Sequence, residues 1–188
     1  MEKINIELLE NKSLQTQIHQ LKEQFIGLFA SMANQIPDAA LTALHPAHKG
    51  KKISKGNELQ HCPYQVLDIV RDFDKKNGFN IRFLNWWGHG LYIIIYHGAA
   101  HTPCADEYHN YLSKGFALSL TGSPWDYKGM IIHKMYSTDI PFEQIPTHID
   151  KLKHLQFIKR INYNIGVKDL EKSLMEEWRT IKKFKGFE

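Results

Sequence analysis

Residues 79–97 read Phe-Asn-Ile-Arg-Phe-Leu-Asn-Trp-Trp-Gly-His-Gly-Leu-Tyr-Ile-Ile-Ile-Tyr-His, and this stretch decides the fold. Segments 79–87 and 91–97 are rich in aromatic and β-branched residues, and a short segment with two glycines separates them. This pattern predicts two antiparallel strands joined by a three-residue loop, because glycine adopts the positive φ that such loops need. If the hairpin is symmetric about His89, residues whose numbers sum to 178 pair with each other.

The symmetric register divides the side chains of the hairpin between two faces, because side chains alternate along a strand. One face is expected to carry Arg82, Leu84, Trp86, Tyr92, Ile94 and Tyr96. The other is expected to carry Phe83, Asn85, Trp87, Leu91, Ile93, Ile95 and His97. Both sets contain large apolar groups, so we expect the hairpin to lie centrally in a sheet that is covered on both faces.

An amphipathic helix precedes the hairpin in the sequence. Apolar residues recur at spacings of three and four, and the pattern stops before Pro37. The residues of this stripe are Leu14, Ile18, Leu21, Phe25, Leu28 and Met32. The stripe is too short to indicate a coiled coil, so it packs either on the domain core or on a second copy of the chain. The second alternative makes the protein a homodimer, with the helix as an interaction module.

The remaining pattern predicts a mixture of helices and strands. We expect a loop over 38–56, helices over 64–73, 102–115, 142–152 and 170–181, and strands over 116–121 and 130–136. Residues 155–163 fit either a strand or a helix. The order predicts an α+β protein, with an antiparallel sheet of about four strands built from two hairpins. The N-terminal helix and the C-terminal helices pack on this sheet. We expect one domain over 1–188, with a helical arm over 1–36 and an α+β core over 55–188.

Composition restricts the class of protein. The chain has 188 residues, of which 43% are hydrophobic, so it can form one packed core. Its longest apolar run, 91–96, is far shorter than the ~20 residues of a membrane-spanning helix, and residues 1–7 lack the pattern of a signal peptide. Two cysteines in a chain of this length are typical of a reducing compartment. We therefore expect a cytoplasmic protein that is not attached to a membrane.

Known catalytic and binding motifs are missing from the sequence. It has no glycine-rich phosphate loop, no Gly-x-Ser-x-Gly motif, no His-Glu-x-x-His motif and no paired Cys-x-x-Cys motifs. These absences predict no cofactor. The formal net charge of +4 is a weak attraction for phosphates and no RNA-binding motif occurs, so we expect no nucleic acid partner.

Residues 55–125 resemble a small bacterial protein family that has no assigned activity. The likeness rests on a Pro-Tyr-x-Val-Leu-Asp segment, an arginine-led strand ending in Trp-Trp-Gly, and a later turn that contains tryptophan. In this sequence the residues are Pro63, Tyr64, Val66, Leu67, Asp68, Arg82, Trp86, Trp87, Gly88 and Trp125. His89 and Gly90 depart from the pattern of the family. The resemblance implies a shared fold and leaves the function open.

Two hypotheses place a site near the hairpin. In the first, aromatic side chains form a site for a small molecule or a partner; the residues are Arg82, Trp86, Trp87, Tyr96 and Trp125. In the second, the protein is an enzyme for a small anionic substrate, in which Asp68 and Arg82 hold the anion and His97 carries the proton. The second hypothesis requires these three side chains to meet in one accessible cleft. Alternatively, the acidic and basic residues only pin one element to another.

Histidines also gather after the hairpin. His97, His101, Cys104 and His109 carry nitrogen and sulfur atoms of the kind that bind zinc. Their spacing matches none of the standard zinc patterns, however, and Cys104 and His109 lie on different faces of the predicted helix. We therefore expect no metal site and treat His97, His101 and Cys104 as the candidates if one exists.

Overall fold

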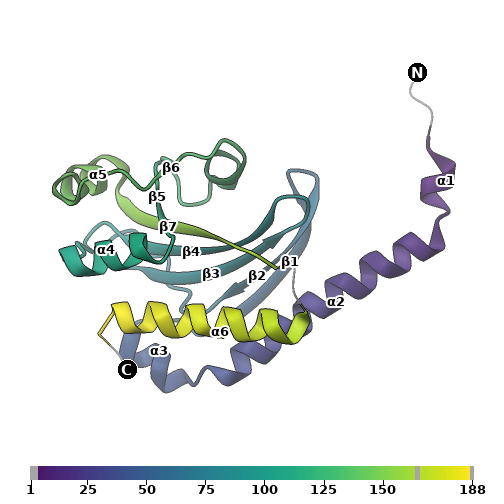
Figure 1. Ribbon diagram of the computed structural model, residues 1–188, viewed down its shortest axis with the longest axis horizontal. Coiled ribbons are helices and arrows are strands. Elements are labelled where there is room, and N and C mark those ends of the chain that lie inside the picture. The colour runs from purple at the N-terminus through teal and green to yellow at the C-terminus, as the bar shows by residue number, and fades with distance from the viewer. Residues whose placement is uncertain (1–3, 164–165, 187–188) are drawn as a thin grey trace.

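The computed structural model describes residues 4–163 and 166–186, and it shows an α+β fold (Figure 1). In the described part of the chain, seven strands form one antiparallel sheet in the order β1-β2-β3-β4-β7-β5-β6. The strands are β1 (Lys52–Leu59), β2 (Cys62–Asp68), β3 (Phe79–Trp86), β4 (Gly90–Gly98), β5 (Ala117–Ser119), β6 (Tyr136–Ser137) and β7 (His154–Ile161). The predicted class, the antiparallel sheet and the terminal helices are confirmed. The prediction of about four strands is wrong.

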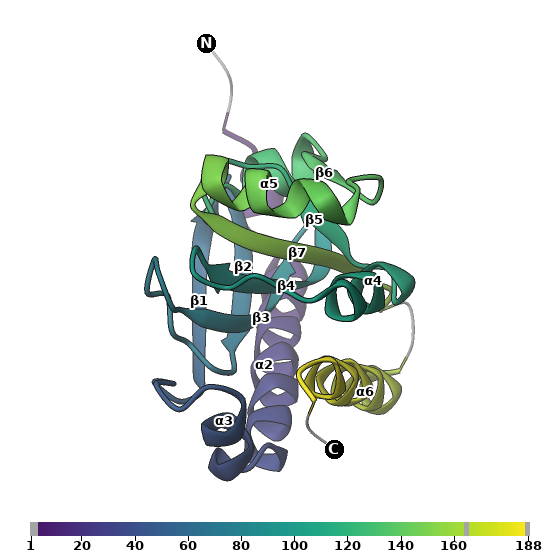
Figure 2. The same ribbon diagram turned by 90° about the vertical axis from the view of Figure 1, so that its left-hand side faces the viewer.

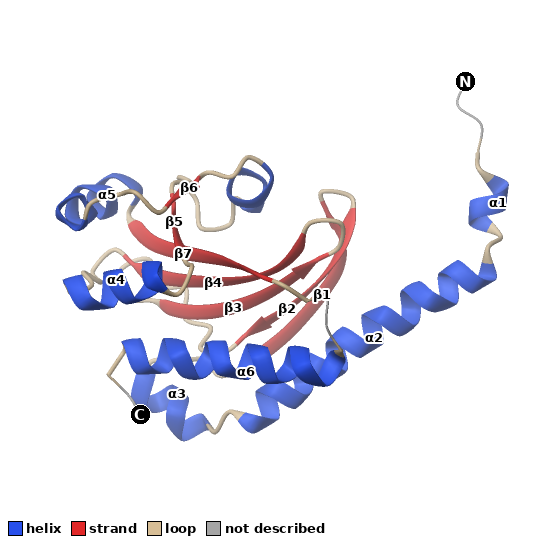
Figure 3. Cartoon of the chain, in the orientation of Figure 1, coloured by secondary structure: helices blue, strands red, loops and turns tan. Residues whose placement is uncertain are grey.

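Helices flank the curved sheet, as Figure 3 shows. They are α1 (Ile6–Leu9), α2 (Lys12–Gln35), α3 (Asp38–Leu44), α4 (Ala105–Ser113), α5 (Ile145–Leu152) and α6 (Val167–Phe184). A π-helical turn over Lys128–Ile132 and a 3-10 turn over Phe142–Gln144 complete the list. Among residues 4–163 and 166–186, no helix combines the length and the apolarity needed to cross a membrane.

The central hairpin forms as predicted, but its register differs from the symmetric one. Trp86 pairs with Gly90 and Phe79 pairs with His97, so the loop is centred on Gly88 instead of His89. Gly88 has a φ of 77°, which explains why the turn is centred on a glycine. The pairing has moved by two residues. Because side chains alternate with a period of two, the predicted assignment of side chains to the two faces is still correct.

The sheet has an apolar core on each face. The first core holds Phe83, Ile93 and Phe157, and it is covered by α2, α4 and α6. Figure 2 shows α6 lying beside α2 and α4. The second core holds Leu84, Trp86, Ile94 and Ile158, and the segment around the π-helical turn covers it with Met130 and Ile131. This short segment cannot cover the whole second face.

Several predicted elements are wrong. The predicted loop over 38–56 contains α3 and the edge strand β1. The predicted helix over 64–73 is β2 followed by an irregular segment. The predicted strand over 130–136 is mostly the π-helical turn and its flanks, and residues 155–163 resolve into β7. Helix α4 starts two residues later than Pro103, the expected first helical residue, because Cys104 is its N-cap.

The N-terminal helix divides into two halves. Helix α2 ends before Pro37, as predicted, and Leu28, Phe29 and Met32 are buried in the main core. The first half of α2 and α1 project from the body (Figure 1). Residues 1–3 of the predicted arm lie outside the described residues. The C-terminal half of the stripe therefore packs on the core.

Candidate functional site

An ion pair on the second face of the sheet forms the base of the candidate site. Asp68 and Arg82 are direct cross-strand neighbours on β2 and β3. Arg82 Nε lies 2.7 Å from Asp68 Oδ1 and Arg82 Nη2 lies 2.8 Å from Asp68 Oδ2, so the guanidinium grips the carboxylate with two parallel bonds. Asn80 Nδ2 donates a further bond of 2.8 Å to Asp68 Oδ1. The two charged side chains are only 13% and 6% exposed, and the neighbours satisfy their charges.

Aromatic rings cover the guanidinium of Arg82. The centroids of the Trp125 and Phe73 rings lie 5.0 and 5.3 Å from its central carbon. The Tyr127 ring lies 5.9 Å away, and Arg82 Nη1 donates to the Tyr127 hydroxyl. Burial alone would lower the pKa of Arg82, but the bonds to Asp68 and the Tyr127 oxygen raise it, so the guanidinium stays charged. Arg82 thus holds the three rings in place through cation–π contacts.

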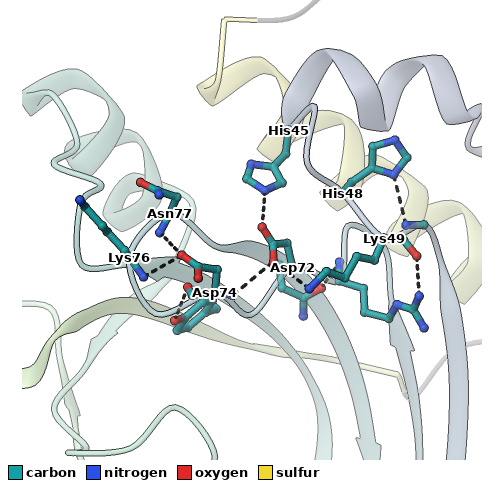
Figure 4. Close-up of polar contacts among 11 residues, drawn as sticks. His45, His48, Lys49, Asp72, Asp74, Lys76 and Asn77 are labelled. Carbon is teal, nitrogen blue, oxygen red and sulfur yellow. Dashed lines mark hydrogen bonds and ion pairs between the residues drawn. The ribbon is translucent and has the colours of Figure 1, made fainter.

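The loop between β2 and β3 carries Phe73, whose ring contacts Arg82, and Figure 4 shows the polar contacts of Asp72 and Asp74 on either side of it in the sequence. Asp72 anchors the loop, because its carboxylate accepts a 2.7 Å bond from His45 Nε2 and lies 3.5 Å from Lys49 Nζ. Burial would raise the pKa of Asp72, but His45 and the neighbouring amide and lysine lower it. Asp74 Oδ1 accepts bonds from two backbone N–H groups later in the loop, at 2.9 and 2.6 Å. Phe73 is therefore held between two fixed carboxylates.

A groove of about 480 Å³ opens beside Trp125. Four segments line it: the β2–β3 loop, β4, the turn before the π-helical turn, and the α5–β7 connection. The lining residues are Phe73, Lys75, Tyr96, Gly122, Ser123, Pro124, Trp125, Leu152, Lys153 and His154. Its volume lies in the range of small-molecule sites.

Two polar side chains of the sheet, Tyr96 and His154, line this groove. The Tyr96 hydroxyl donates a 3.1 Å bond to the Asp74 carbonyl. His154 Nδ1 lies 2.9 Å from the Leu152 carbonyl, which places its proton on Nδ1, and no described residue bonds to Nε2. Burial lowers the pKa of His154, so this imidazole is neutral. Gln156 Nε2 donates 3.1 Å to the Pro124 carbonyl, which fixes the turn that carries Trp125.

The structure brings three of the five predicted ligand-binding residues together: Arg82, Tyr96 and Trp125. Trp86 lies farther along the same face, is fully buried, and donates its indole N–H to the Leu59 carbonyl at 2.9 Å. Trp87 bonds to Gln65 Oε1 at 2.9 Å, away from the groove. The Trp-Trp-Gly turn itself is therefore at the opposite end of the strands from the groove.

Sequence reasoning missed four groove residues, Phe73, Lys75, Lys153 and His154. Phe73 ends the segment 64–73 that the apolar spacing predicts as a helix, and Lys75 lies two residues beyond it. Lys153 and His154 lie where α5 ends, at a residue with a φ of 60°. The apolar spacing that ends at Leu152 was the one available signal for this helix end.

The enzyme hypothesis requires His97 to meet Asp68 and Arg82, and the structure separates them. His97 lies on the first face of the sheet, where its ring stacks on Phe79 at 4.9 Å and on His101 at 4.1 Å between centroids. Asp68 and Arg82 lie on the second face. The three side chains therefore share no cleft, and the Asp–Arg pair pins two strands and an aromatic cover together.

The histidine candidates meet only in part. His97 and His101 lie together, but Cys104 Sγ accepts the Glu107 N–H at 3.4 Å as the N-cap of α4. His109 is exposed and packs near Phe142.

No protein-family model, curated protein or solved structure matches the chain. The resemblance to a small bacterial family thus stays a prediction. Its residues occupy β2, β3, the β3–β4 turn and the Trp125 turn.

Proposed function

We propose that the protein binds a small organic anion with a flat aromatic part in the groove beside Trp125. The observation that carries this proposal is the Trp125 ring, which is 48% exposed at the rim of the groove. Its edge packs on Phe73 with centroids 4.7 Å apart, and Arg82 holds it from below. A large ring fixed in this way offers a stacking surface at little cost in conformational entropy.

The charge at the groove favours an anion. Lys75 and Lys153 both line it and are exposed. Lys153 forms an ion pair with Asp150, with Nζ 2.6 Å from Oδ1, whereas Lys75 forms no ion pair with a described residue. Asp68 neutralises Arg82 beneath the rings, so the cationic groups that line the groove are the two lysines.

The groove favours binding over catalysis. Its described polar groups are a phenol bonded to a carbonyl, the Ser123 hydroxyl, which accepts the Trp125 N–H, a neutral imidazole and the two lysines. No nucleophile is paired with a base there among the described residues, which is the arrangement that covalent catalysis requires. The proposal is therefore a ligand site, and the enzyme hypothesis built on Asp68, Arg82 and His97 is set aside.

A matched pair of probes tests the proposal. We expect 2-naphthoate to quench tryptophan fluorescence and to bind more tightly than its neutral amide, 2-naphthamide. Trp125 is the most exposed tryptophan in the described chain, so the signal reports mainly on the groove. We expect Trp125→Ala and Lys75→Ala each to weaken binding about tenfold, as measured by isothermal titration calorimetry.

Two control variants accompany these measurements. Lys128→Ala removes an exposed lysine outside the groove, and Trp87→Phe removes a tryptophan at the far end of the strands. Both are expected to bind 2-naphthoate as the wild type does. Equal affinity for the acid and the amide, or unchanged binding in Trp125→Ala, would contradict the proposal.

A further inference from the structure

A second cluster of ionisable groups lies on the first face of the sheet, away from the groove. His97 comes from the end of β4, His101 from the loop that follows, and Glu107 from the first turn of α4. One ligand atom from each of these residues lies within 4.8 Å of the others. Lys185, the C-cap of α6, completes the cluster.

We infer that His97, His101 and Glu107 form a binding site for a divalent transition metal ion such as Zn²⁺, in competition with the Lys185 ammonium group. Two imidazoles and one carboxylate are a donor set found in zinc sites, and they leave a fourth position open. This inference is independent of the ligand proposed for the groove.

The buried state of His97 is the observation that points to a ligand. Its side chain is 2% exposed, and no described residue bonds to its Nε2 atom. A buried polar atom without a partner costs about 1–3 kcal/mol, so an ion bound at this nitrogen would remove that cost. Burial, together with the charges of Lys185 and its histidine neighbours, also holds the pKa of His97 well below its ordinary value. A metal ion would give this buried nitrogen the partner that the described residues do not supply.

Lys185 marks the place of a cation in this cluster. Its Nζ lies 2.6 Å from Glu107 Oε1 and 3.3 Å from His101 Nε2, and these last two atoms are 3.4 Å apart. Burial would raise the pKa of Glu107, but His101 and Lys185 lower it, so the carboxylate is ionised. The cluster thus already attracts one positive charge, and a divalent ion would interact more strongly with the same carboxylate.

The geometry requires a small adjustment when metal binds. Tetrahedral coordination at about 2.1 Å places ligand atoms about 3.4 Å apart, so a pair separated by the full 4.8 Å must approach by about 1.4 Å. His101 lies in the irregular segment before α4, and its ring can turn away from the stack on His97. Lys185 follows the last residue of α6 and can swing into solvent.

Cobalt and zinc titrations test the inference. We expect wild-type protein to bind one equivalent of Zn²⁺ by calorimetry, and Co²⁺ to give visible absorption bands of a tetrahedral site. His101→Ala and Glu107→Gln are each expected to weaken binding at least about tenfold, and Lys185→Ala to tighten it about tenfold. His109→Ala, which removes an exposed histidine of the same helix, is the matched control and should bind like the wild type.

The possible results of these titrations either support or contradict the metal site. Absence of binding in both wild type and Lys185→Ala overturns the inference, as does binding that survives His101→Ala or is lost in His109→Ala. His101 is partly exposed, so its variant is expected to fold, which a circular dichroism melt checks. Lys185→Ala removes a group that competes with the metal ion, and it removes no ligand. If the cluster had only a structural role, this variant would not bind Zn²⁺ more tightly than the wild type.

Discussion

The Asp68–Arg82 pair provides a sharp test of how the second face is built. Asp68→Asn keeps the volume of the side chain but leaves the Arg82 guanidinium, 13% exposed, without its counterion. The native pair is buried and has two charge-assisted bonds of 2.7 and 2.8 Å, so it contributes more to stability than an exposed salt bridge does. Breaking a buried pair on one side costs about 3–5 kcal/mol. For a chain of this size the melting temperature should fall by about 10 °C.

Urea denaturation followed by circular dichroism measures this loss. The double variant Asp68→Leu/Arg82→Met is expected to recover most of it, because well-packed apolar side chains replace a buried ion pair at little cost. Asp150→Asn is the control: its carboxylate is 83% exposed and its removal should leave stability unchanged. If Asp68→Asn costs less than about 1 kcal/mol, the pair behaves like a surface salt bridge and the reasoning is refuted.

Three further predictions concern the rest of the chain. Deleting residues 1–20 should leave the melting temperature unchanged. Deleting residues 1–36 should unfold the protein because this deletion removes the buried half of α2. Comparing the sedimentation velocity of the 1–20 deletion with that of the full chain also shows whether the projecting half joins two copies. Burial lowers the pKa of His97 from 6.5, so below that pH the unfolded chain binds a proton that the folded chain does not. The free energy of unfolding should therefore fall as the pH drops from about 7 to 5, by up to about 1.4 kcal/mol per pH unit for this group. Urea titrations with chelator present should show that the free energy of unfolding of His97→Leu depends less steeply on pH than that of the wild type. Gly98→Ala would place its Cβ 2.6 Å from a backbone oxygen of the β2–β3 loop, so it should lower the melting temperature, whereas Gly27→Ala, with open space around it in α2, should not.

The number of strands could not be predicted because β1 and β2 lack an alternating pattern and residues 155–163, which form β7, also fit a helix. Strand β2 is buried on both faces: Val66 belongs to the second core and Leu67 to the first. Such a strand has a continuous apolar run, and its residues also match helical spacing. Strand β1 could not be predicted for the opposite reason, because its sequence is polar. It is an edge strand with Lys52 and Lys55, and lysines protect sheet edges from pairing with other chains, so its sequence resembles a solvated loop.

The candidate site was predictable where alternation along a strand decides the geometry. The sequence places Arg82 and Tyr96 on one face of the hairpin and His97 on the other, and the structure has them so. The same parity already argued against an enzyme site shared by Arg82 and His97. Trp125 and Phe73 lie in irregular segments, and their approach to Arg82 depends on long-range bonds such as His45 to Asp72. No local pattern encodes those contacts.

The groove exists because the second face is incompletely covered. The segment around the π-helical turn covers Leu84 and Ile94, but the polar end of the face extends beyond it. There Asp68 and Arg82 satisfy each other, and the rings of the Trp125 turn close over them. A face closed by one turn and one loop leaves a gap between them, and the groove lies in that gap.

The two proposed sites lie back to back on β4. Tyr96 faces the groove, and the next residue, His97, faces the histidine cluster on the other side of the sheet. The sites share backbone but no side chain, so substituting one lining residue removes at most one of them. Neighbouring positions nevertheless couple energetically, commonly by 0.5–3 kcal/mol in size, on the order of a tenfold change in affinity. Zn²⁺ titrations of Trp125→Ala and 2-naphthoate titrations of His101→Ala, two residues outside β4, therefore show whether each site binds independently of the other. Either proposal can fail while the other holds.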